Sequence, residues 1–592
     1  MKYLLSLLLC LFTLAVSSQN EQLAQNYFDK GDFEKARLSF EELHAKQPSN
    51  SFYFQRLLES NQQLQQFEEV ERLIQQRLAK YKQASLLVEL GYNFQLKKDL
   101  TKAKKYYEEA LDRIRNNPQE VYGVAPAFER RSQIEYALQA YQTAVQLEPK
   151  FNFNFQMALL YGQLGNTDMM VSMLLDEAHR NPHSSIIVQN QLSRFMNGEE
   201  GETTFNESLR KALLVRAQKN QDVFWNEYLS WFYVQQKEYG KAFIQEKAIY
   251  KRNGENFANI VNLGHLAIEE DDREIATEIL TFVLDNTQDI DILVRANHYL
   301  TEMQIDAATA KDFQQIDLHL ATLIENYGVS PYTLPLQLLQ ARFVTFHLRQ
   351  PERGKTILKD ALELPLNKYQ RADVKMELAD IFLFEEKFNQ ALLYYSQIEE
   401  ELKNDEIGHQ ASLKAAKTSY FKTDFTWAIA QFKALKSASS QLIANDALEY
   451  FLLLNDNTVA DSTQAALKLF ARADYLLYQN KDKEALAQLQ TILQTFKGDE
   501  IVPVTLLRLG QTHEQLSDYA SALSSYSELI ENHKESIYID EALYFSAEIY
   551  RNLKDPEKAK PLYEQLLFNH QDSIYFVDAR KKFRLLRGDT NL

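Results

Sequence analysis

Small and aromatic residues recur along the chain with the spacing of two helices that pack against each other. In residues 23–48 small side chains stand where two helices could cross closely, and aromatic side chains stand where the space between them needs filling. A glycine stands where a turn would begin, and a proline where the second helix would stop. The segment therefore predicts a helix, a short turn and a second helix, with these marker residues: Ala24, Tyr27, Gly31, Phe33, Ala36, Phe40 and Pro48.

The small position of the second helix returns at a nearly constant interval. It recurs after 34, 33, 34 and 33 residues, at Ala36, Val70, Ala103, Ala137 and Met170. A period of this length indicates an array of helix pairs, in which each pair buries its apolar face against its neighbours. An aromatic or aliphatic residue follows four positions after each of these, at Phe40, Ile74, Tyr107, Tyr141 and Leu174.

This pattern resembles the tetratricopeptide repeat, whose period is about 34 residues. The resemblance covers most of residues 21–585. It implies an all-α fold, namely an α-solenoid of helix-turn-helix repeats of the tetratricopeptide type that forms a right-handed superhelix. The small position of the second helix recurs less regularly in the middle of the chain, at Ala242, Ala276, Ala391 and Ala428. It is clear again near the end, at Ala485, Ala522 and Ala559.

The repeat pattern also suggests how the chain is divided. It departs from the period near residues 196–221, 285–335 and 436–463, and the polar runs Met196–Glu202 and Leu454–Thr458 suggest loops. We therefore expect a signal peptide at 1–18, an N-terminal array at 19–195, an irregular connection at 196–221, a divergent central array at 222–453, a loop at 454–463, and a C-terminal array with a capping helix at 464–592.

Two segments near the end match each other, at His533–Leu543 and His570–Arg580. Their Ser–x–Tyr followed by an acidic–Ala step resembles repeats of the bacterial outer-membrane assembly lipoprotein BamD and of the Tol-associated cell-division coordinator. In those families proline often precedes the serine, whereas Glu535 and Asp572 stand there in this chain. Ser536 and Ser573 also suit helix N-caps, which explains the pattern without any function.

A single closing helix is expected at residues 573–586. A repeat array exposes an unpaired face at its last helix pair, and a terminal helix can cover it. The predicted helix carries a cationic face near its C-terminus, which suits the helix dipole. Its apolar stripe would contain Ile574, Phe576, Val577, Phe583 and Leu586, packed on the pair that holds Ala547 and Ala559.

The N-terminus has the pattern of an export signal. Lys2 precedes an apolar run over residues 3–16, which is too short to span a bilayer, and Ser17 and Ser18 follow with small side chains. Cleavage is expected before Gln19; a short buried helix is the alternative. Cys10 lies inside the apolar run, where a lipoprotein cysteine would not stand. We therefore expect an exported bacterial protein of the periplasm or outer membrane.

Composition and charge narrow the function classes. Glycine and proline number 16 and 12 in 592 residues, which favours long regular elements. The formal net charge of −17 argues against nucleic acid as a partner, because such a surface repels phosphate. No later segment is apolar enough to cross a membrane, although peripheral association with one stays open.

A few sequence motifs resemble parts of enzyme or metal sites. Arg353–Thr356 resembles the end of a phosphate-binding loop, but Arg349 stands where that loop needs its first glycine. His179 and His183 have helical metal-ligand spacing, yet Pro182 lies between them and should end the helix. Runs of carboxylates suit solvated surfaces. We therefore expect no enzyme activity, no cofactor and no metal.

The resemblance places certain first-helix positions on the inner face of the superhelix. A mixture of aromatic, amide and charged groups suits an extended peptide or a partner helix, so protein partners are expected. The Lys–Asn clamp of chaperone-binding repeats is absent, which argues against an acidic C-terminal tail as the ligand. The candidate binding residues are Tyr92, Gln95, Trp231, His265, Asp380, Gln511, Glu514, Tyr544, Glu548 and Arg551.

Two alternatives stay open at this point. Many of these residues could instead pack against a neighbouring superhelical turn. The abundant aromatic residues also suit an accessory protein that binds glycan or peptidoglycan, because sugar faces stack on aromatic rings. That second alternative requires Tyr92, Trp231 and Tyr544 to be exposed in one groove.

Overall fold

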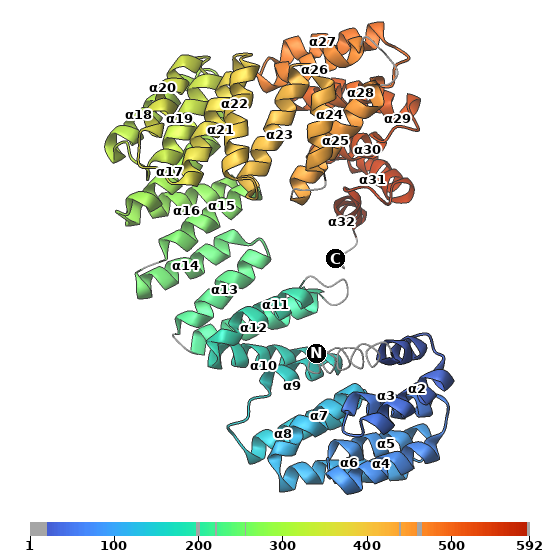
Figure 1. Cartoon of the computed structure of the whole chain (residues 1–592). Coiled ribbons are helices and arrows are strands. Elements are labelled where there is room, and N and C mark those ends of the chain that lie inside the picture. The colour runs from blue at the N-terminus through green and yellow to red at the C-terminus, as the bar shows by residue number, and fades with distance from the viewer. Residues whose placement is uncertain are drawn as a thin grey trace, which may run out of the picture. The chain divides into compact units, whose positions relative to one another are not determined.

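The chain is a succession of paired α-helices (Figure 1). The computed structural model describes residues 20–196, 202–219, 222–254, 256–436, 440–458 and 464–588, and the expected signal peptide at 1–18 lies outside them. Within these ranges there are α-helices and two short 3-10 helices, and no strand. The all-α solenoid predicted from the sequence is confirmed. The chain divides into two compact units, residues 1–220 (unit 1) and 221–592 (unit 2).

Unit 1 begins with a helical segment over residues 20–29. It is followed by helices α2 (Phe33–Lys46), α3 (Ser51–Gln63), α4 (Phe67–Tyr81), α5 (Ser85–Leu96), α6 (Leu100–Asn116), η1 (Pro118–Glu120), α7 (Val121–Arg130), α8 (Ile134–Leu147), α9 (Asn154–Gln163), α10 (Thr167–Arg180), η2 (Pro182–Ser184), α11 (Ser185–Met196) and α12 (Glu202–Lys219).

Helix α12 corrects the expected irregular connection over residues 196–221. Residues 202–219 are helical because Phe205, Leu209 and Leu213 recur every fourth residue and are buried. Arg216 fastens this helix to α10, since its guanidinium donates to Asp176 at 2.8 Å. The acidic run before α12 hid this apolar stripe from the sequence pattern.

Unit 2 contains a longer succession of helices. They are α13 (Val223–Gln235), α14 (Tyr239–Asn253), α15 (Phe257–Glu269), α16 (Arg273–Asn286), α17 (Ile290–Ala307), α18 (Phe313–Tyr327), α19 (Leu334–Phe346), α20 (Pro351–Leu362), α21 (Lys368–Phe384), α22 (Phe388–Glu401), α23 (Glu406–Phe421), α24 (Phe425–Leu435), α25 (Gln441–Thr458), α26 (Ala465–Tyr478), α27 (Asp482–Thr495), α28 (Val502–Gln515), α29 (Tyr519–Asn532), α30 (Ile539–Asn552), α31 (Pro556–Asn569) and α32 (Phe576–Arg587).

Helix α25 corrects a second expectation. Residues 454–458, expected to be a loop, continue this helix, because Leu453 and Leu454 are buried and Asn457 donates its side-chain amide to the Leu453 carbonyl. Helix α25 packs on α24, while the next pair begins with α26, which packs on α23. An additional helix therefore interrupts the regular succession of pairs.

The two helices of a pair meet at a small residue of the first helix, which we call the slot residue. The second helix fills the slot with a residue that stands sixteen positions later: Tyr107 opposite Gly91, and Tyr526 opposite Gly510. A Cβ atom at Gly510 would overlap the Tyr526 ring. The small and aromatic markers of the sequence are thus the contacts that hold each pair together.

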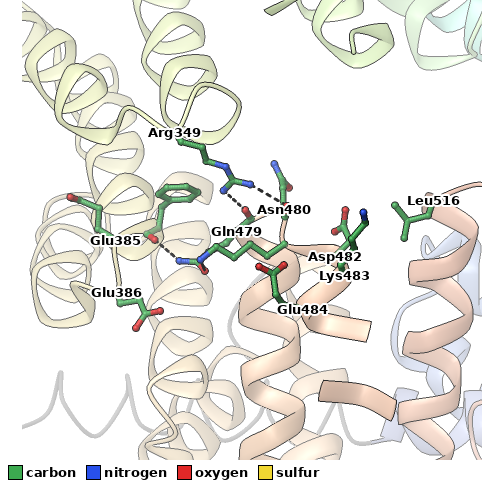
Figure 2. A pocket seen from close by; sticks show the side chains of 11 residues that line it. Arg349, Glu385, Glu386, Gln479, Asn480, Asp482, Lys483, Glu484 and Leu516 are labelled. Carbon is green, nitrogen blue, oxygen red and sulfur yellow. Dashed lines mark hydrogen bonds between the residues drawn. The ribbon is translucent and has the colours of Figure 1, made fainter. Parts of the chain in front are cut away.

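A set of hydrogen bonds, which we call the clamp, joins helices of unit 2 that are distant in sequence (Figure 2). Arg349 donates to the carbonyls of Gln479, at 2.5 Å, and Asn480, at 3.1 Å, just after α26. The Gln479 side chain donates in turn to the Phe384 carbonyl at the end of α21, at 2.7 Å, and the Tyr475 hydroxyl donates to the Leu383 carbonyl at 2.7 Å. The clamp therefore holds the end of α26 to the last carbonyls of α21, and it also holds that end to Arg349, which lies between α19 and α20.

The last helix, α32, covers the final pair as predicted. Ala579 of α32 is buried in one cluster with Ala547 and Ala559, against which Phe583 and Leu586 also pack. Two parts of the expectation are wrong. Ile574 and Val577 are 79% and 68% exposed and lie outside the buried stripe, because Ala579 takes the contact instead.

The matching serine segments also differ from the expectation. The hydroxyl oxygens of Ser536 and Ser573 accept from the backbone N–H groups of Tyr538 and Tyr575, in the turns that precede α30 and α32. The helix N-caps are the tyrosines, so the serines stabilise the turn two residues earlier.

Candidate binding surfaces

All ten candidate residues from the sequence lie on the first helices of their pairs. Tyr92 and Gln95 belong to unit 1, and the other eight belong to unit 2. Their binding role stays a prediction. They are placed as follows: Tyr92 and Gln95 on α5, Trp231 on α13, His265 on α15, Asp380 on α21, Gln511 and Glu514 on α28, and Tyr544, Glu548 and Arg551 on α30.

Four of the candidates accept a hydrogen bond from a buried tyrosine on the second helix of the same pair. The Tyr107 hydroxyl donates to Gln95 at 2.9 Å, and the Tyr526 hydroxyl to Glu514 at 3.1 Å, in both cases across twelve residues. The same arrangement across fifteen residues joins Tyr395 to Asp380 and Tyr563 to Glu548. These hydrogen bonds restrict the conformations of the acceptor side chains. A ligand would therefore meet them in fewer orientations than it would meet unpaired surface groups.

The aromatic candidates are half-buried and are partly covered by their own chain. The Arg131 guanidinium lies 4.7 Å above the Tyr92 ring, and Tyr575 stacks on Tyr544 at 4.3 Å. Trp231 lies 5.9 Å from the ring of Tyr228. The contacts of Tyr92 and Tyr544 each occupy a ring face that a sugar would need, and no observation of the structure favours the glycan alternative.

The remaining candidates are engaged at the surface of unit 2. The His265 ring lies 4.6 Å from the Tyr299 ring in a tilted arrangement, and Arg551 pairs with Glu548 at 2.7 Å. Gln511 and Glu514 line a wide depression between α28 and the end of α17. Burial raises the pKa of the Glu514 carboxyl, and Glu548 adds to the rise, although the Tyr526 hydroxyl opposes it.

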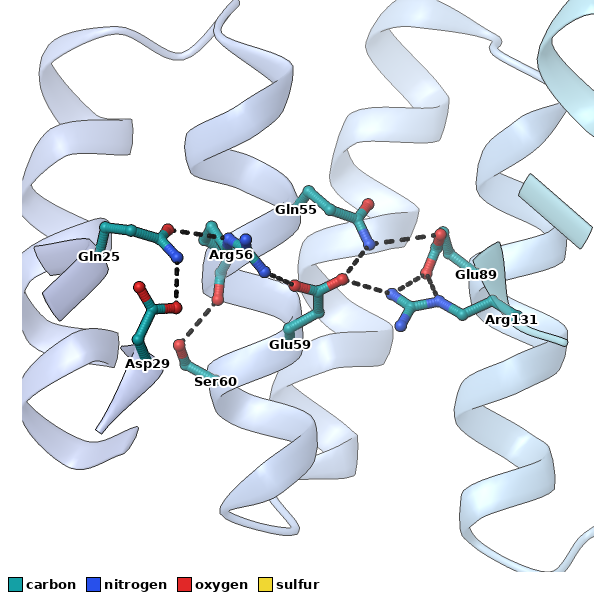
Figure 3. Close-up of polar contacts among 8 residues, drawn as sticks. All are labelled: Gln25, Asp29, Gln55, Arg56, Glu59, Ser60, Glu89 and Arg131. Carbon is teal, nitrogen blue, oxygen red and sulfur yellow. Dashed lines mark hydrogen bonds and ion pairs between the residues drawn. The ribbon is translucent and has the colours of Figure 1, made fainter. Parts of the chain in front are cut away.

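The first candidate surface is a row of polar side chains along the first helices of unit 1, which we call the polar row (Figure 3). Arg56 of α3 donates to Gln25 at 3.1 Å and to Glu59 at 2.8 Å. Arg131, directly after α7, lies 3.4 Å from Glu59 and donates to Glu89 of α5 at 2.6 Å. The row thus runs without interruption over four successive helix pairs.

The polar row is preorganised by its own contacts. Gln55 donates to Glu59 at 3.0 Å and to Glu89 at 3.5 Å, and Gln25 donates to Asp29 at 2.7 Å. The Glu89 side chain is only 3% exposed, which the adjacent Arg131 compensates. Side chains held in this way lose little conformational freedom when a ligand binds.

The second candidate surface is a cavity of about 450 Å³ within unit 2. Its walls come mainly from α19, α21, α23, α26 and α28, with Tyr395 of α22 and Tyr450 of α25. The apolar and aromatic lining is Leu383, Leu413, Phe421, Leu477, Tyr395, Tyr450 and Tyr478. The charged and amide lining is Arg342, Asp380, Gln410, Lys414, Lys417, Asp474 and Arg508.

Asp380 is the centre of one polar network in this cavity. Its carboxylate accepts from the Tyr395 hydroxyl and from the Lys414 ammonium, both at 2.5 Å, while the Arg342 guanidinium lies 3.8 Å away. Arg342 also donates to Glu377 at 3.1 Å. Burial raises the pKa of the Glu377 carboxyl, and Asp380 adds to the rise, whereas Arg342 opposes it.

Asp474 is the centre of a second network. Its carboxylate accepts from the Tyr420 hydroxyl at 2.9 Å and lies 3.2 Å from Nε of Arg508, which is not aligned for a hydrogen bond. Burial raises the pKa of the Asp474 carboxyl, although Arg508 and Tyr420 oppose the rise. Arg508 also lies 4.0 Å from Glu449 of α25.

The cations of the cavity are more exposed than the acids they pair with. The side chains of Asp380 and Asp474 are 4% and 5% exposed, whereas those of Lys414 and Arg508 are 37% and 24% exposed. The carboxylates therefore lie behind the cations, and the cavity presents positive groups above an apolar floor.

Sequence reasoning found only Asp380 among these charged residues, although a signal was available. Several of the charged residues directly follow a buried alanine on a first helix, which is the register that selected Asp380. The clamp and the additional helix α25, which bring α21, α23 and α26 together, were not predictable from this register. The alanine–charged pairs are Ala341–Arg342, Ala379–Asp380, Ala416–Lys417 and Ala473–Asp474.

The motifs that resembled enzyme sites have structural roles. Lys355 lies within α20, is buried, and pairs with Glu385 at 2.7 Å and Glu352 at 2.6 Å. His179 belongs to α10, which ends at residue 180, whereas His183 belongs to η2, so the two are not on one helix. Among the described residues no three His, Cys, Asp or Glu side chains group as metal ligands.

Among the described helices, none combines the length and the apolar character that crossing a bilayer needs.

Three segments match family models described as tetratricopeptide repeat: residues 84–117, 505–536 and 540–567. They correspond to the pairs α5–α6, α28–α29 and α30–α31. The chain therefore contains tetratricopeptide repeats, as its sequence predicts, and this repeat indicates protein partners. The finer likeness to BamD and the Tol-associated coordinator stays a prediction.

No protein of curated function matches the sequence. Solved structures that align with it share only a low identity. They include the Naa15/Naa10 complex bound to HypK-THB (13% identity, 97% of this chain and 96% of that chain, TM-score 0.30), yeast Tom70 (16%, 82% and 100%, 0.29) and the APC/C hetero-tetramer Cut9–Hcn1 (12%, 96% and 96%, 0.22).

Proposed function

We propose that this chain is a non-catalytic scaffold of the bacterial cell envelope that binds a segment of a partner protein along the first helices of its repeats. The observation that carries the proposal is the polar row of unit 1. It presents amide, carboxylate and guanidinium groups at regular intervals across successive pairs.

The spacing of these groups suits the backbone of an extended segment. An extended peptide exposes its N–H and C=O groups along its whole length, and a row of fixed donors and acceptors can pair with them. Arg56 and Arg131 supply donors, while Gln25 and Gln55 supply both donors and acceptors. Neighbouring aromatic side chains such as Tyr92 add apolar contact area.

The assignment as a scaffold without catalysis rests on how the charged groups are used. Arg131 pairs with both Glu89 and Glu59, and these pairs fix the orientation of the three side chains. A general base or nucleophile would instead be directed toward a reacting group. The proposal therefore requires no cofactor.

Location in the envelope is supported by the sequence alone. The apolar run at 3–16 followed by Ser17 and Ser18 suits an export signal, and the segments at 533–543 and 570–580 resemble envelope repeats. N-terminal sequencing of the chain expressed in a bacterium tests this part. A mature N-terminus at Gln19 in the periplasmic fraction supports it, and an intact Met1 in the cytosol contradicts it.

Site-specific photocrosslinking tests the binding surface. Benzoylphenylalanine placed at Gln55 or Tyr92 should give saturable crosslinks to a partner in envelope extracts, whereas the same probe at exposed Lys104 on the second helix α6 should not. Crosslinks that form equally at Lys104 would place binding elsewhere. Excess unlabelled protein should abolish the specific crosslinks.

A further inference from the structure

The cavity of unit 2 combines an apolar floor with an incompletely satisfied cationic wall. Leu413, Phe421 and Leu477 provide surface that favours an apolar side chain over water. A volume of about 450 Å³ has room for one large side chain and a neighbouring polar group.

The cations around this floor differ in how fully they are engaged. Lys414 is held by Asp380 at 2.5 Å and Arg342 by Glu377 at 3.1 Å. The ammonium group of Lys417, in contrast, makes no hydrogen bond among the described residues. Its nearest acid is Asp446 at 3.6 Å, which lies outside the lining, and its ammonium lies 4.9 Å from the Tyr450 ring.

Arg508 has a similarly loose arrangement. Its guanidinium lies 4.0 Å from Glu449, and its Nε lies 3.2 Å from Asp474 without being aligned for a hydrogen bond. Glu449 and Asp446 stand outside the lining, and the two acids within it, Asp380 and Asp474, are almost fully buried. An entering carboxylate would therefore supply Lys417 and Arg508 with the aligned acceptor that each of them lacks.

We propose that this cavity binds a leucine or aromatic side chain together with the carboxylate of an adjacent Asp or Glu in an extended segment of the partner. The inference rests on the proposed scaffold function and specifies what unit 2 recognises. The apolar side chain occupies the floor, and the carboxylate pairs with Lys417. A free small carboxylate offers the same chemistry, so the test must separate the two sources.

Fluorescence polarisation with the full chain and labelled, C-terminally amidated peptides provides the test. The probe is Gly-Ser-Phe-Glu-Ser-Gly, and its matched controls replace Phe by Ala or Glu by Gln. Amidation removes the terminal carboxylate, so only the internal acid is tested. Each replacement should weaken binding about tenfold.

Substitution on the protein side identifies the cavity. Lys417→Gln should weaken binding of the probe about tenfold and remove the preference for Glu over Gln, while Lys433→Gln on exposed α24 should change neither. Equal binding of the Glu and Gln peptides to the unsubstituted protein, or an unchanged preference in the Lys417→Gln variant, would overturn the proposal. The peptide comparison does not depend on any variant folding.

Two further outcomes are decisive. Binding of 3-phenylpropionate without binding of the peptide would overturn the peptide assignment in favour of a small carboxylate. Failure of every peptide, while the unit 1 crosslinks from Gln55 and Tyr92 persist, would overturn this inference and leave the scaffold function standing. Loss of those crosslinks with retained peptide binding would instead contradict the scaffold function as proposed for unit 1.

Discussion

At the scale of single residues, slot residues determine how closely the two helices of a pair approach. Gly91 and Gly510 each lie against a tyrosine ring of the second helix, with no room for a Cβ atom. The same tyrosines then donate their hydroxyl groups to Gln95 and Glu514. In each of these pairs, one tyrosine therefore both packs the two helices together and orients the polar side chain on the first helix.

Gly510→Ala tests this close approach. The added Cβ overlaps the Tyr526 ring, so the free energy of unfolding should fall by about 1–3 kcal/mol. Gly123→Ala in α7 is the matched control, because its Cβ would meet only Ser85 at 3.9 Å. The control should be neutral or stabilising by up to about 1 kcal/mol, since alanine favours helix over glycine. Urea unfolding measures both, and equal effects would contradict the packing argument.

Glu541 gives the second prediction at this scale. Burial, with Glu449 and Asp540 adding to it, raises the pKa of the Glu541 carboxyl from 4.5 to about 7. The folded chain therefore holds a proton that the unfolded chain releases, so the free energy of unfolding falls as pH rises from about 4.5 to 7.

Glu541→Gln should remove this loss of stability. At pH 8 the variant should be more stable than the unsubstituted chain by about 1–3 kcal/mol, and at pH 4.5 the two should be equal. Urea unfolding at both pH values measures the difference, with exposed Glu564→Gln as control. A difference that is the same at both pH values would show that ionisation is not its cause.

At the scale of elements, the clamp and the additional helix α25 break the simple succession of pairs. Helix α26 packs on α23 and is held to α21 by bonds that join residues 91 to 98 positions apart. This arrangement brings Asp474 and Leu477 into the wall of the cavity. The cavity is thus a product of contacts between non-neighbouring pairs.

Arg349→Ala tests the clamp. The guanidinium donates to two carbonyls after α26, so its loss should cost about 1–3 kcal/mol and increase hydrogen exchange in residues 476–481. Arg472→Ala is the matched control, because Arg472 and Glu386 form a pair whose side chains are both nearly half exposed. Such a surface pair contributes at most about 1 kcal/mol. Equal exchange in both variants would mean that the clamp does not secure α26.

Deletion of residues 573–592 tests the capping helix. Removal of α32 exposes the cluster around Ala547 and Ala559 and frees Glu548 from Lys582, its partner at 3.0 Å. Hydrogen exchange should rise across residues 537–568 and stay unchanged in unit 1, because stability in repeat arrays is mainly nearest-neighbour. Unchanged protection across 537–568 would show that α32 is not a cap.

At the scale of the whole molecule, the chain consists of two compact units. One buried cluster of unit 1 runs from Phe54 to Leu160, and unit 2 has buried apolar residues from Trp225 to Ala579. Each unit buries enough apolar surface to be expected to fold by itself.

A protease site introduced between Asn220 and Gln221 tests this independence. After cleavage, both products should keep their helical circular dichroism, and each should unfold at the midpoint that it shows in the intact chain. The uncleaved variant serves as control. Loss of helicity in either product would show that the unit depends on the other for folding.

The sequence by itself determined the repeat and the contacts within a pair. These contacts join a small residue of the first helix to an aromatic residue sixteen positions later in the second helix. Because this separation is the same in different pairs, the pattern can be recognised in the sequence without the structure. The same register also located Asp380, one residue after Ala379. The sequence pattern did not predict helices α12 and α25, because the segments there are rich in polar residues. Their leucines are buried only through contacts with neighbouring helices.

Only the tertiary structure decided the cavity and the clamp. Arg342 and Arg508 are 166 residues apart in sequence, and no local period specifies that they line one space. Their meeting depends on the rotation between successive pairs, which accumulates over several repeats and changes where α25 is inserted. Because that rotation is set by packing between pairs, the sequence pattern could locate residues on a face but could not determine which faces converge.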